Sequence, residues 1–421
     1  MKPASLRKRS SRFSRSDRRQ GRRRRGRQAR SGSSIQRSVR KLSADRKSPP
    51  SAVGKRVAQI MIEWSRAARS PHRRLPPRFS GSGQPRPFPP RGEGDAWRCA
   101  AEGLALDLAL SQPAAAPPFH LANAIFLELE ALSSRPAALT RFSVAAAVER
   151  AARQFLRLLA RSMAAIRRHG RKLVRSAHRI VTYSATEAVE DLIRLGLVRS
   201  RRMEVWLSES RPAGEGVAAA ERLARAGADV TLMTDAALFA SMSGADLLLV
   251  GADALSRDGV IHKIGTSVLV EAASSHRVPV VVVAREERFL PPALAAFISS
   301  SNGPAERLYP RRLRRLRRLR AVHKPFDLTS FDRVDKFVTT WGVLAPAEAA
   351  AAFAGRKHSL RLQKMLVSRL GLPGPRPSAV PGKRGRRRPP KRRRPRAAPI
   401  AGRGKRRRTR PRGGRRRPGP P

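Results

Sequence analysis

From residue 178 onward, the sequence alternates short apolar runs with longer segments of helical spacing. The apolar runs are HRIVTY, MEVWL, DVTLM, DLLLV and VPVVVVA, and the segments between them are ATEAVEDLIRLGLV, GEGVAAAERLARAG, DAALFASMS and GTSVLVEAASSHR. Runs that are apolar on both faces, and that helices separate, predict a parallel sheet covered by helices on both sides. In such a sheet, ligands bind at the carboxyl ends of the strands, beside helix N-termini. We therefore expect an α/β domain over residues 176–355 with a binding site along that edge.

Helical spacing without strand signals precedes this domain. The segments AWRCAAEGLALDLALSQP, HLANAIFLELEALSS and SVAAAVERAARQFLRLLARSMAAIRRHGRKLV have this spacing, and the last is long and amphipathic. They predict a small helical domain over residues 97–175. Residues 50–96 are rich in Pro and Arg and contain one segment of helical spacing, AVGKRVAQIMIEWSRAA. We interpret most of this stretch as a linker.

Both ends of the chain are strongly basic. The formal charge of the 421-residue chain is +60; residues 1–50 hold 19 basic and 2 acidic residues, and residues 371–421 hold 21 basic and no acidic residues. Their apolar content is too low to offset the entropy of ordering, so we predict disordered basic tails in residues 1–96 and, after a short helix, in residues 356–421. Such tails attract RNA or DNA nonspecifically, and no aromatic residues interleave with the arginines to stack on bases.

Several classes of site are not expected. The single cysteine, Cys99, excludes an internal disulfide and a cysteine-rich zinc site, so a reducing, cytoplasmic location fits. There is no run of about 18 apolar residues, so we predict no membrane span. The segment VGADA lacks the GxGxxG pattern of dinucleotide binding, and we expect no cofactor and no metal.

The run LLLV ends on Gly251-Ala252-Asp253, and Lys263, Gly265 and Thr266 follow. This order places the Asp253 carboxylate just past a buried strand, on the ligand edge. Gly265 and Thr266 open the next helix, whose N-terminal amides can accept a phosphate, with Lys263 beside them. The combination suits an anionic sugar phosphate. The spacing also allows the alternative that Asp253 only caps a turn and that Lys263 is solvated.

Four segments in this order resemble a known family. They are RIVTYSATEAVEDLI (179–193), WLSESRPAGEG (206–216), LLLVGADAL with KIGTS (247–267), and KPFDLTSFDRVDKFVTTWGVLAP (324–346), and LSQPAAAPPFHLANAI is a weaker match. The sequence over residues 100–350 is similar to the alpha, beta and delta regulatory subunits of translation initiation factor 2B. The related isomerases of methylthioribose-1-phosphate and ribose-1,5-bisphosphate share this signature, although the pattern of kept and changed positions is nearer to the regulatory subunits.

The resemblance implies a helical N-terminal domain, a Rossmann-like C-terminal domain, a sugar-phosphate pocket between them, and oligomers formed through the sheet domain. It implies that Asp253 acts with a cysteine in moving a proton between sugar carbons, but Ser184 takes the place of that cysteine. A serine hydroxyl without a partner base is a poor proton donor or acceptor near neutral pH. Three further positions depart from the pattern of the family, and they are Gln112, Glu215 and His262. Five positions keep it, and they are Arg211, Asp253, Lys263, Gly265 and Thr266.

Three functions remain open from the sequence. The broken catalytic pair favours a non-catalytic member of this family that binds a sugar phosphate or nucleotide as a scaffold, and its expected partners are a second copy or further copies of the chain. The first alternative is an aldose–ketose isomerase that uses Asp253, helped by His262 or Ser184. The second is a basic protein associated with nucleic acid. In all three, Arg211, Ser184, Glu215, His262, Lys263, Gly265 and Thr266 are the candidate ligand-binding residues.

The segment YPRRLRRLRRLRAVHK (309–324) has a leucine at every third position, with arginine pairs between. As a helix it would present a narrow leucine stripe and a broad cationic face to RNA, an acidic partner or a membrane surface. The alternative is an insertion whose leucines pack onto the sheet domain.

Overall fold

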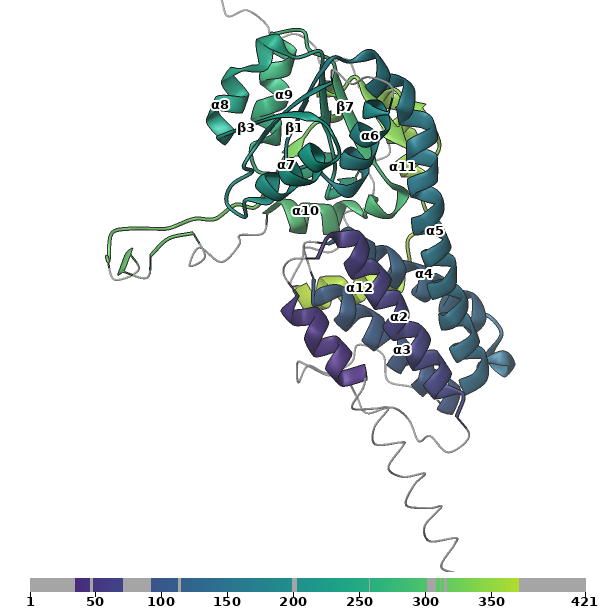
Figure 1. Cartoon of the computed structure of the whole chain (residues 1–421). Helices are drawn as coiled ribbons and strands as arrows, with labels where there is room; N and C mark the ends of the chain where they lie inside the picture. The colour runs from purple at the N-terminus through teal and green to yellow at the C-terminus, as the bar shows by residue number, and fades with distance from the viewer. Residues whose placement is uncertain are drawn as a thin grey trace, which may run out of the picture. The chain divides into compact units, whose positions relative to one another are not determined.

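The structure is a computed structural model of the whole chain (Figure 1). It describes residues 35–45, 48–70, 92–112, 115–198, 203–256, 258–300, 308–310, 312–313 and 316–370. The helical and α/β regions belong to one compact unit, which ends at Pro375. Most of the predicted basic tails lies outside the described residues.

A bundle of helices forms the first core. Its members are a helix over residues 35–44, α2 (Pro50–Ala68), α3 (Glu93–Leu110), α4 (Ala116–Ser133), the first half of α5 (Arg141–Ser176), and α12 (Leu360–Leu370). Trp64 of α2 and Trp97 of α3 meet edge to face in this core, with 5.9 Å between ring centroids. Leu362 and Leu366 bring α12 back to the same core from the end of the chain.

The helical domain therefore begins earlier than the predicted boundary at residue 97. In α2, the buried positions Val53, Val57, Met61, Trp64 and Ala68 recur every three or four residues, which is the pattern of a core-facing helix. The Pro- and Arg-rich composition around this segment suggested a linker, and it concealed how much apolar surface α2 contributes. The short helix expected before the C-terminal tail is α12, and it packs into the bundle, which the sequence did not predict.

The helix α5 is shared between two cores. Thr140 and Ser143 form a capping box at its start, and the helix then runs for 36 residues, or about 54 Å. Val148 and Phe155 in its first half pack in the helical bundle, whereas Ile166 and Val174 in its second half pack against the sheet. A single rigid element thus fixes the bundle to the α/β domain.

A seven-stranded sheet with the order β10-β9-β7-β4-β1-β2-β3 forms the α/β domain. The strands are β1 (Arg179–Thr182), β2 (Glu204–Ser208), β3 (Asp229–Met233), β4 (Leu247–Val250), β7 (Val280–Ala284), β9 (Lys336–Thr339) and β10 (Val343–Leu344). All adjacent pairs are parallel except β9 with β10. The predicted fold class, a helical region followed by a Rossmann-like parallel sheet, is confirmed.

Helices cover both faces of this sheet. The helices on the two faces are α6 (Glu187–Leu197), α7 (Glu215–Arg225), α8 (Asp235–Ala240), α9 (Thr266–Ser275) and α11 (Pro346–Ala354). On one face, α6, α7 and the second half of α5 pack against strand residues such as Ile180 and Leu249. On the other face, α8, α9 and α11 pack against residues such as Val181 and Leu248. The alternation within β1 and β4 explains why these strands are continuously apolar in sequence.

A small antiparallel sheet follows β4 where the sequence suggested only a polar turn. It consists of β5 (Ala254–Ser256), β6 (Gly259–Lys263) and β8 (Phe326–Thr329). The hairpin of β5 and β6 turns the chain back, so that residues at the end of β6 return to Asp253. The helix α10 (Pro292–Ser300) packs against this sheet.

The α-helix expected over residues 309–324 is absent from the described part of this segment, which consists of turns and irregular backbone with 3-10 geometry at residues 312 and 313. Leu316 and Leu319 are 52% and 43% exposed, so the alternative of leucines packed onto the sheet domain is also wrong for these two residues. A three-residue leucine repeat drifts around a helix of 3.6 residues per turn, and the intervening arginines repel one another.

If α2 belongs to the core, Trp64→Ala should lower the free energy of unfolding by about 4 kcal/mol, because it leaves a large cavity beside Trp97. Chemical denaturation followed by circular dichroism measures this value. Glu63→Ala, on the exposed side of the same turn, is the matched control and should change it by less than about 0.5 kcal/mol. If the two substitutions changed the free energy of unfolding equally, α2 would not be part of the hydrophobic core.

Candidate active site

The order of the strands locates the site. After β1, the chain adds β2 and β3 on one side, and it then crosses to place β4 on the other side. The carboxyl ends of β1 and β4 therefore flank the point where the direction of strand addition reverses, which is where ligands bind in such sheets. Gly251 permits a close approach here, since a Cβ at this position would lie 2.3 Å from the Thr186 side chain.

Asp253 and His262 form a hydrogen-bonded pair at this point. His262 Nδ1 lies 2.9 Å from Asp253 Oδ2, and His262 Nε2 lies 3.3 Å from the backbone oxygen of Tyr183. Both ring nitrogens thus face an oxygen that can accept a hydrogen bond. The Asp253 carboxylate is held by a side chain from the β5–β6 hairpin, which argues against the alternative that it only caps a turn.

Asp253 is held in its ionised form. Burial alone would raise its pKa, but the hydrogen bond and charge of His262, together with the cations Arg288 and Lys263, outweigh burial and lower the pKa of Asp253 below its usual range. The carboxylate is therefore charged at neutral pH, in a largely buried place.

A second cluster joins Ser184, Glu215 and Lys263. The Ser184 hydroxyl donates to Glu215 Oε1 at 2.8 Å, and Lys263 Nζ lies 2.5 Å from the same oxygen. Lys263 is only 7% exposed, so the alternative of a solvated lysine is wrong. Ser184 has a left-handed backbone (φ 47°), a conformation that costs energy for a residue with a side chain, and its amide donates to Ser210 Oγ. The serine that replaces the expected cysteine thus has a carboxylate partner.

The N-terminus of α9 differs from the predicted phosphate site. The backbone amides of Gly265 and Ser267 donate to Asp327 Oδ2 at 2.8 and 3.0 Å, and the Ser267 hydroxyl donates to the same oxygen. Thr266 is buried, and its hydroxyl donates to the backbone oxygen of Lys263. A carboxylate of the chain itself therefore takes the place that a phosphate was expected to occupy, so Gly265 and Thr266 shape the turn after Lys263.

Arg211 is exposed in the loop between β2 and α7. Its backbone amide donates to Asp235 Oδ2 at 2.9 Å. Among the described residues, its guanidinium has no ion pair with the nearby carboxylates of Glu209 or Glu215.

A cluster of charged residues after β7 was not found from the sequence. Arg285, Glu287 and Arg288 are 5%, 0% and 4% exposed, although they follow directly on the apolar strand. Arg285 Nε lies 2.7 Å from Glu287 Oε1, and Arg288 donates to the backbone oxygen of Asp253 at 3.3 Å. Arg285 also faces Glu187 of α6, which accepts a hydrogen bond from Ser51 of α2. Three charged residues immediately after a buried strand, on the ligand edge, were the signal.

The two arginines repel each other in this buried cluster. Arg285 Nη2 is buried without a hydrogen-bond acceptor among the described residues, although Arg285 Nε lies beside Glu287. Burial and the repulsion of Arg285 lower the pKa of Arg288, and Asp253, Glu287 and Glu187 only partly offset this. Both arginines line a small pocket with Thr186, Glu187, Ala188, Ala252 and Val283. An anion that entered this pocket would relieve the repulsion between the two arginines and supply an acceptor for Arg285 Nη2.

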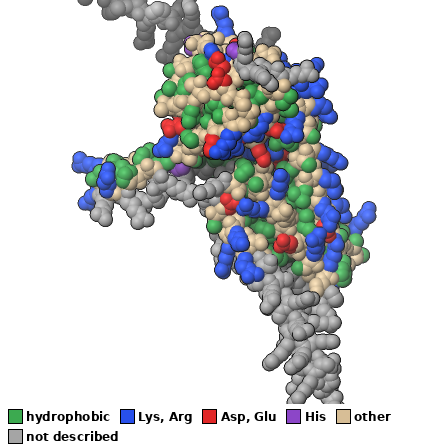
Figure 2. Space-filling model, in the orientation of Figure 1, with side chains coloured by type: hydrophobic (Ala, Val, Ile, Leu, Met, Phe, Trp, Pro, Cys, Tyr) green, Lys and Arg blue, Asp and Glu red, His purple; other side chains and the backbone are tan. Residues whose placement is uncertain are grey.

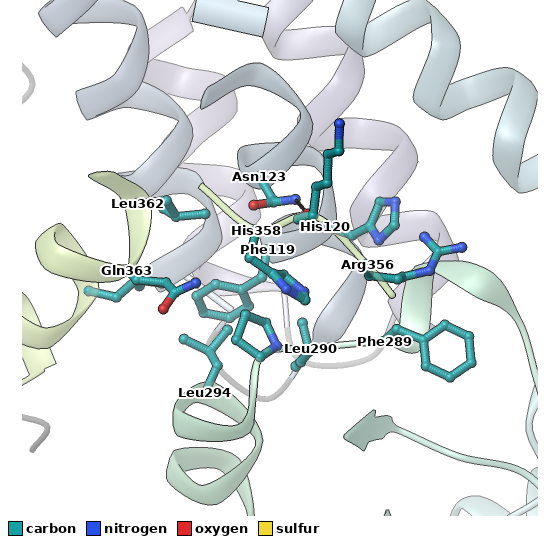
Figure 3. Close-up of a pocket in the computed structure, with 13 residues that line it drawn as sticks. Phe119, His120, Asn123, Phe289, Leu290, Leu294, Arg356, His358, Leu362 and Gln363 are labelled. Carbon is teal, nitrogen blue, oxygen red and sulfur yellow. Dashed lines mark hydrogen bonds between the residues drawn. The ribbon is translucent and has the colours of Figure 1, made fainter. Parts of the chain in front are cut away.

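A separate pocket lies between α4, α10 and the segment before α12 (Figure 3). It encloses about 440 Å³, including its open mouth, and its walls include His120, Leu294 and His358. Burial, followed by the charge of Arg356 and the neighbouring His358, lowers the pKa of His120 to about 3. No carboxylate lines this pocket, so it offers no ionised base comparable to Asp253.

Among the described residues, no group of three or more His, Cys, Asp or Glu side chains could hold a metal ion. Within the same part of the chain, no helix has the length and apolar character needed to cross a membrane.

The fold is that of α/β proteins with a mostly parallel sheet and a strand switch point. Residues 107–346 match the Initiation factor 2 subunit family, and the chain belongs to this family. The predicted resemblance is thereby confirmed.

Curated relatives include both enzymes and translation factors. The ribose 1,5-bisphosphate isomerase of Archaeoglobus fulgidus is 30% identical over 204 residues, which are 48% of this chain and 65% of that protein. The translation initiation factor eIF2B subunit beta of Dictyostelium discoideum is 30% identical over 174 residues, which are 40% of this chain and 44% of that protein. The matches to the isomerases of Archaeoglobus fulgidus and Methanocaldococcus jannaschii cover 65% and 64% of their lengths, slightly less than two thirds.

Solved structures share the fold. The Pyrococcus horikoshii translation initiation factor eIF-2B superposes with a TM-score of 0.57 at 21% identity, over 75% of this chain and 98% of that chain. The 5-methylthioribose 1-phosphate isomerase of the same organism gives a TM-score of 0.56 at 17% identity, over 76% and 86%. A third similar structure, at 16% identity, is a tetrameric eIF2B-beta2-delta2 complex. For this chain, self-association and a cytoplasmic location remain predictions.

Because the pKa of Asp253 is lowered in the folded chain, its charge contributes stability above the pKa of an unfolded aspartate, and this contribution is lost as the pH falls through the lower, folded value. Asp253→Asn should therefore reduce the free energy of unfolding by about 2 kcal/mol at neutral pH. The difference from the unchanged protein should shrink as the medium becomes acidic.

Urea unfolding from neutral to acidic pH measures both quantities. Asp229→Asn, at an exposed position on β3, is the control. A constant difference between the Asp253→Asn protein and the unchanged protein at all pH values would contradict a charged Asp253.

Proposed function

We propose that this protein binds a phosphorylated pentose at the carboxyl ends of β1 and β4 and interconverts its aldose and ketose forms. The ionised Asp253, hydrogen-bonded to His262 beside two buried arginines, carries the proposal. The sequence alone favoured a non-catalytic scaffold, but several of the curated relatives are ribose 1,5-bisphosphate isomerases, which supports the alternative that was also considered.

An aldose–ketose shift moves a proton between two adjacent carbons and another between two oxygens, so substrate and product have the same atoms. Asp253 takes the proton from one carbon and returns it to the next. His262 positions the carboxylate through Nδ1. Ser184 contacts the sugar oxygens, and Glu215 accepts a proton through the Ser184 hydroxyl from one oxygen and gives it back to the other. Both groups end as they began, and no cofactor is needed.

The phosphate occupies the pocket of Arg285 and Arg288. A guanidinium presents two parallel donors to phosphate oxygens, and burial makes the attraction stronger than in water. Arg288 also touches the Asp253 backbone, so a phosphate held there would lie next to the proton-transferring carboxylate. Arg211, exposed on the β2 side of the switch point, is the cation that would meet a second phosphate.

The second candidate is the non-catalytic scaffold, and the replacement of the implied cysteine by Ser184 favours it. A hydroxyl is a weaker acid than a thiol, and Glu215 is already shared with Lys263. In this case the protein would bind the same phosphorylated sugar without converting it.

Incubation with ribose-1,5-bisphosphate and, separately, methylthioribose-1-phosphate distinguishes the two candidates. We expect NMR to show ketose signals with one of them. Asp253→Asn should lower the rate by about 100-fold or more, because it removes the proton acceptor. Asp229→Asn is the control and should leave the rate unchanged, and Ser184→Cys should raise it. Binding of both sugars without turnover, in the unchanged protein and in Ser184→Cys, would establish the scaffold instead.

The phosphate subsite has its own test. Ribose-1,5-bisphosphate should raise the melting temperature of the unchanged protein, because a ligand that binds only the native state stabilises it. Arg288→Lys keeps the charge but loses the fork, and we expect about tenfold weaker binding, or about 1.4 kcal/mol. Arg333→Lys, at an exposed ion pair with Glu271, is the control. If ribose-1,5-bisphosphate raised the melting temperatures of the two variants equally, Arg288 would not belong to the phosphate site.

A further inference from the structure

The exposed side of α5 carries an uninterrupted row of cations. Between residues 150 and 176 the sequence contains nine Arg and Lys residues and no Asp or Glu. All nine side chains are exposed, and they are Arg150, Arg153, Arg157, Arg161, Arg167, Arg168, Arg171, Lys172 and Arg175. At about 100° per residue, all except Arg167 fall within a sector roughly 100° wide. We call these eight residues the α5 stripe.

Most of the stripe is not neutralised. Arg150 pairs with Glu128, and Arg153 pairs with Glu149. The other six members have no ion pair with a carboxylate of the described residues. Like charges one turn apart on a helix destabilise it. Here the helix is held instead by its buried face, which belongs to two cores. The cations thus lie on a rigid helix. No ion pair among the described residues offsets the repulsion between six of them.

We propose that the α5 stripe binds the phosphate backbone of double-helical nucleic acid. From Arg150 to Arg175 the stripe is about 38 Å long, and a duplex of that length carries roughly 22 phosphate charges. Arginine dominates the stripe, and its planar fork suits phosphate oxygens. Figure 2 shows Lys and Arg side chains along the edge of the molecule where Figure 1 places α5.

The composition of this face favours nucleic acid over a membrane. A helix that lies in a membrane surface needs large exposed apolar side chains beside its cations. Between residues 150 and 176, the other exposed residues of α5 are instead small or polar, as at Gln154, Ala160 and Ala164, and no large apolar side chain of this stretch is exposed. The stripe also has no aromatic side chain to stack on bases, so recognition is independent of base sequence.

Fluorescence anisotropy with the full chain tests the proposal. The probes are an RNA duplex and a DNA duplex of the same sequence, each about 25 base pairs and so longer than the stripe. The test protein carries Arg157→Gln, Arg161→Gln, Arg171→Gln and Arg175→Gln. The matched control carries Arg317→Gln, Arg318→Gln, Arg320→Gln and Lys324→Gln, which remove four exposed charges from a different segment. Both proteins keep the basic tails.

We expect the test protein to bind duplexes at least tenfold more weakly than the control at physiological salt. The slope of log affinity against log salt should fall by about 3.6, or roughly 0.9 for each lost phosphate contact. An RNA or DNA preference would identify the source of the phosphates, and equal binding would show that the duplex backbone alone is recognised; both support the proposal.

Equal losses in the test and control proteins would overturn the proposal. It would also fail if the test protein lost affinity only for phosphatidylserine vesicles or polyglutamate. The melting temperatures of both proteins must match that of the unchanged chain. If the fourfold variant melts earlier, Arg161→Gln with Arg171→Gln gives the same test with about half the change in slope.

Discussion

The structure depends on the continuity of α5 through two hydrophobic cores. Its first half packs in the helical bundle. Its second half packs so closely against α6 and the sheet that a Cβ at Gly170 would lie 2.7 Å from Leu192 of α6 and 3.2 Å from Val338 of β9. A helix of this length cannot bend sharply without a proline or an inserted group, and its sequence contains no proline. The buried side of α5 thus connects the helical bundle to the α/β domain through both cores. The cations on its exposed side take no part in either core.

The order of the strands in the sheet determines the position of the candidate site. The reversal of strand order between β1 and β4 leaves an edge where two loops meet, and the β5–β6 hairpin then brings His262 and Lys263 back to it. His262, Arg288 and Lys263 keep Asp253 ionised, whereas Arg285 and Arg288 repel each other and Arg285 Nη2 has no acceptor among the described residues. An anionic sugar would complete this arrangement. The family to which the chain belongs includes proteins named as isomerases of such a sugar, and others named as translation factors.

The sequence predicted the α/β domain well because its strands are apolar on both faces, and such runs between helical segments are typical of a covered parallel sheet. It also predicted Asp253, His262 and Lys263 at the edge, and the structure brings them within reach of one another. Prediction from the sequence failed for contacts between residues that lie far apart in the chain. Asp327 occupies the N-terminus of α9 from about 60 residues away, a contact that no local pattern reveals. Arg285 and Arg288 resembled an ordinary polar loop, since burial depends on what packs above them. The helix α2 was underestimated because composition was averaged over a Pro- and Arg-rich stretch.

A crystal structure of the protein with ribose-1,5-bisphosphate tests the central claim most directly. The account predicts a phosphate within hydrogen-bond distance of the Arg288 guanidinium, with the sugar carbons beside the Asp253 carboxylate. A sugar bound elsewhere, for example between His120 and His358, with the charged cluster after β7 unchanged, would contradict it.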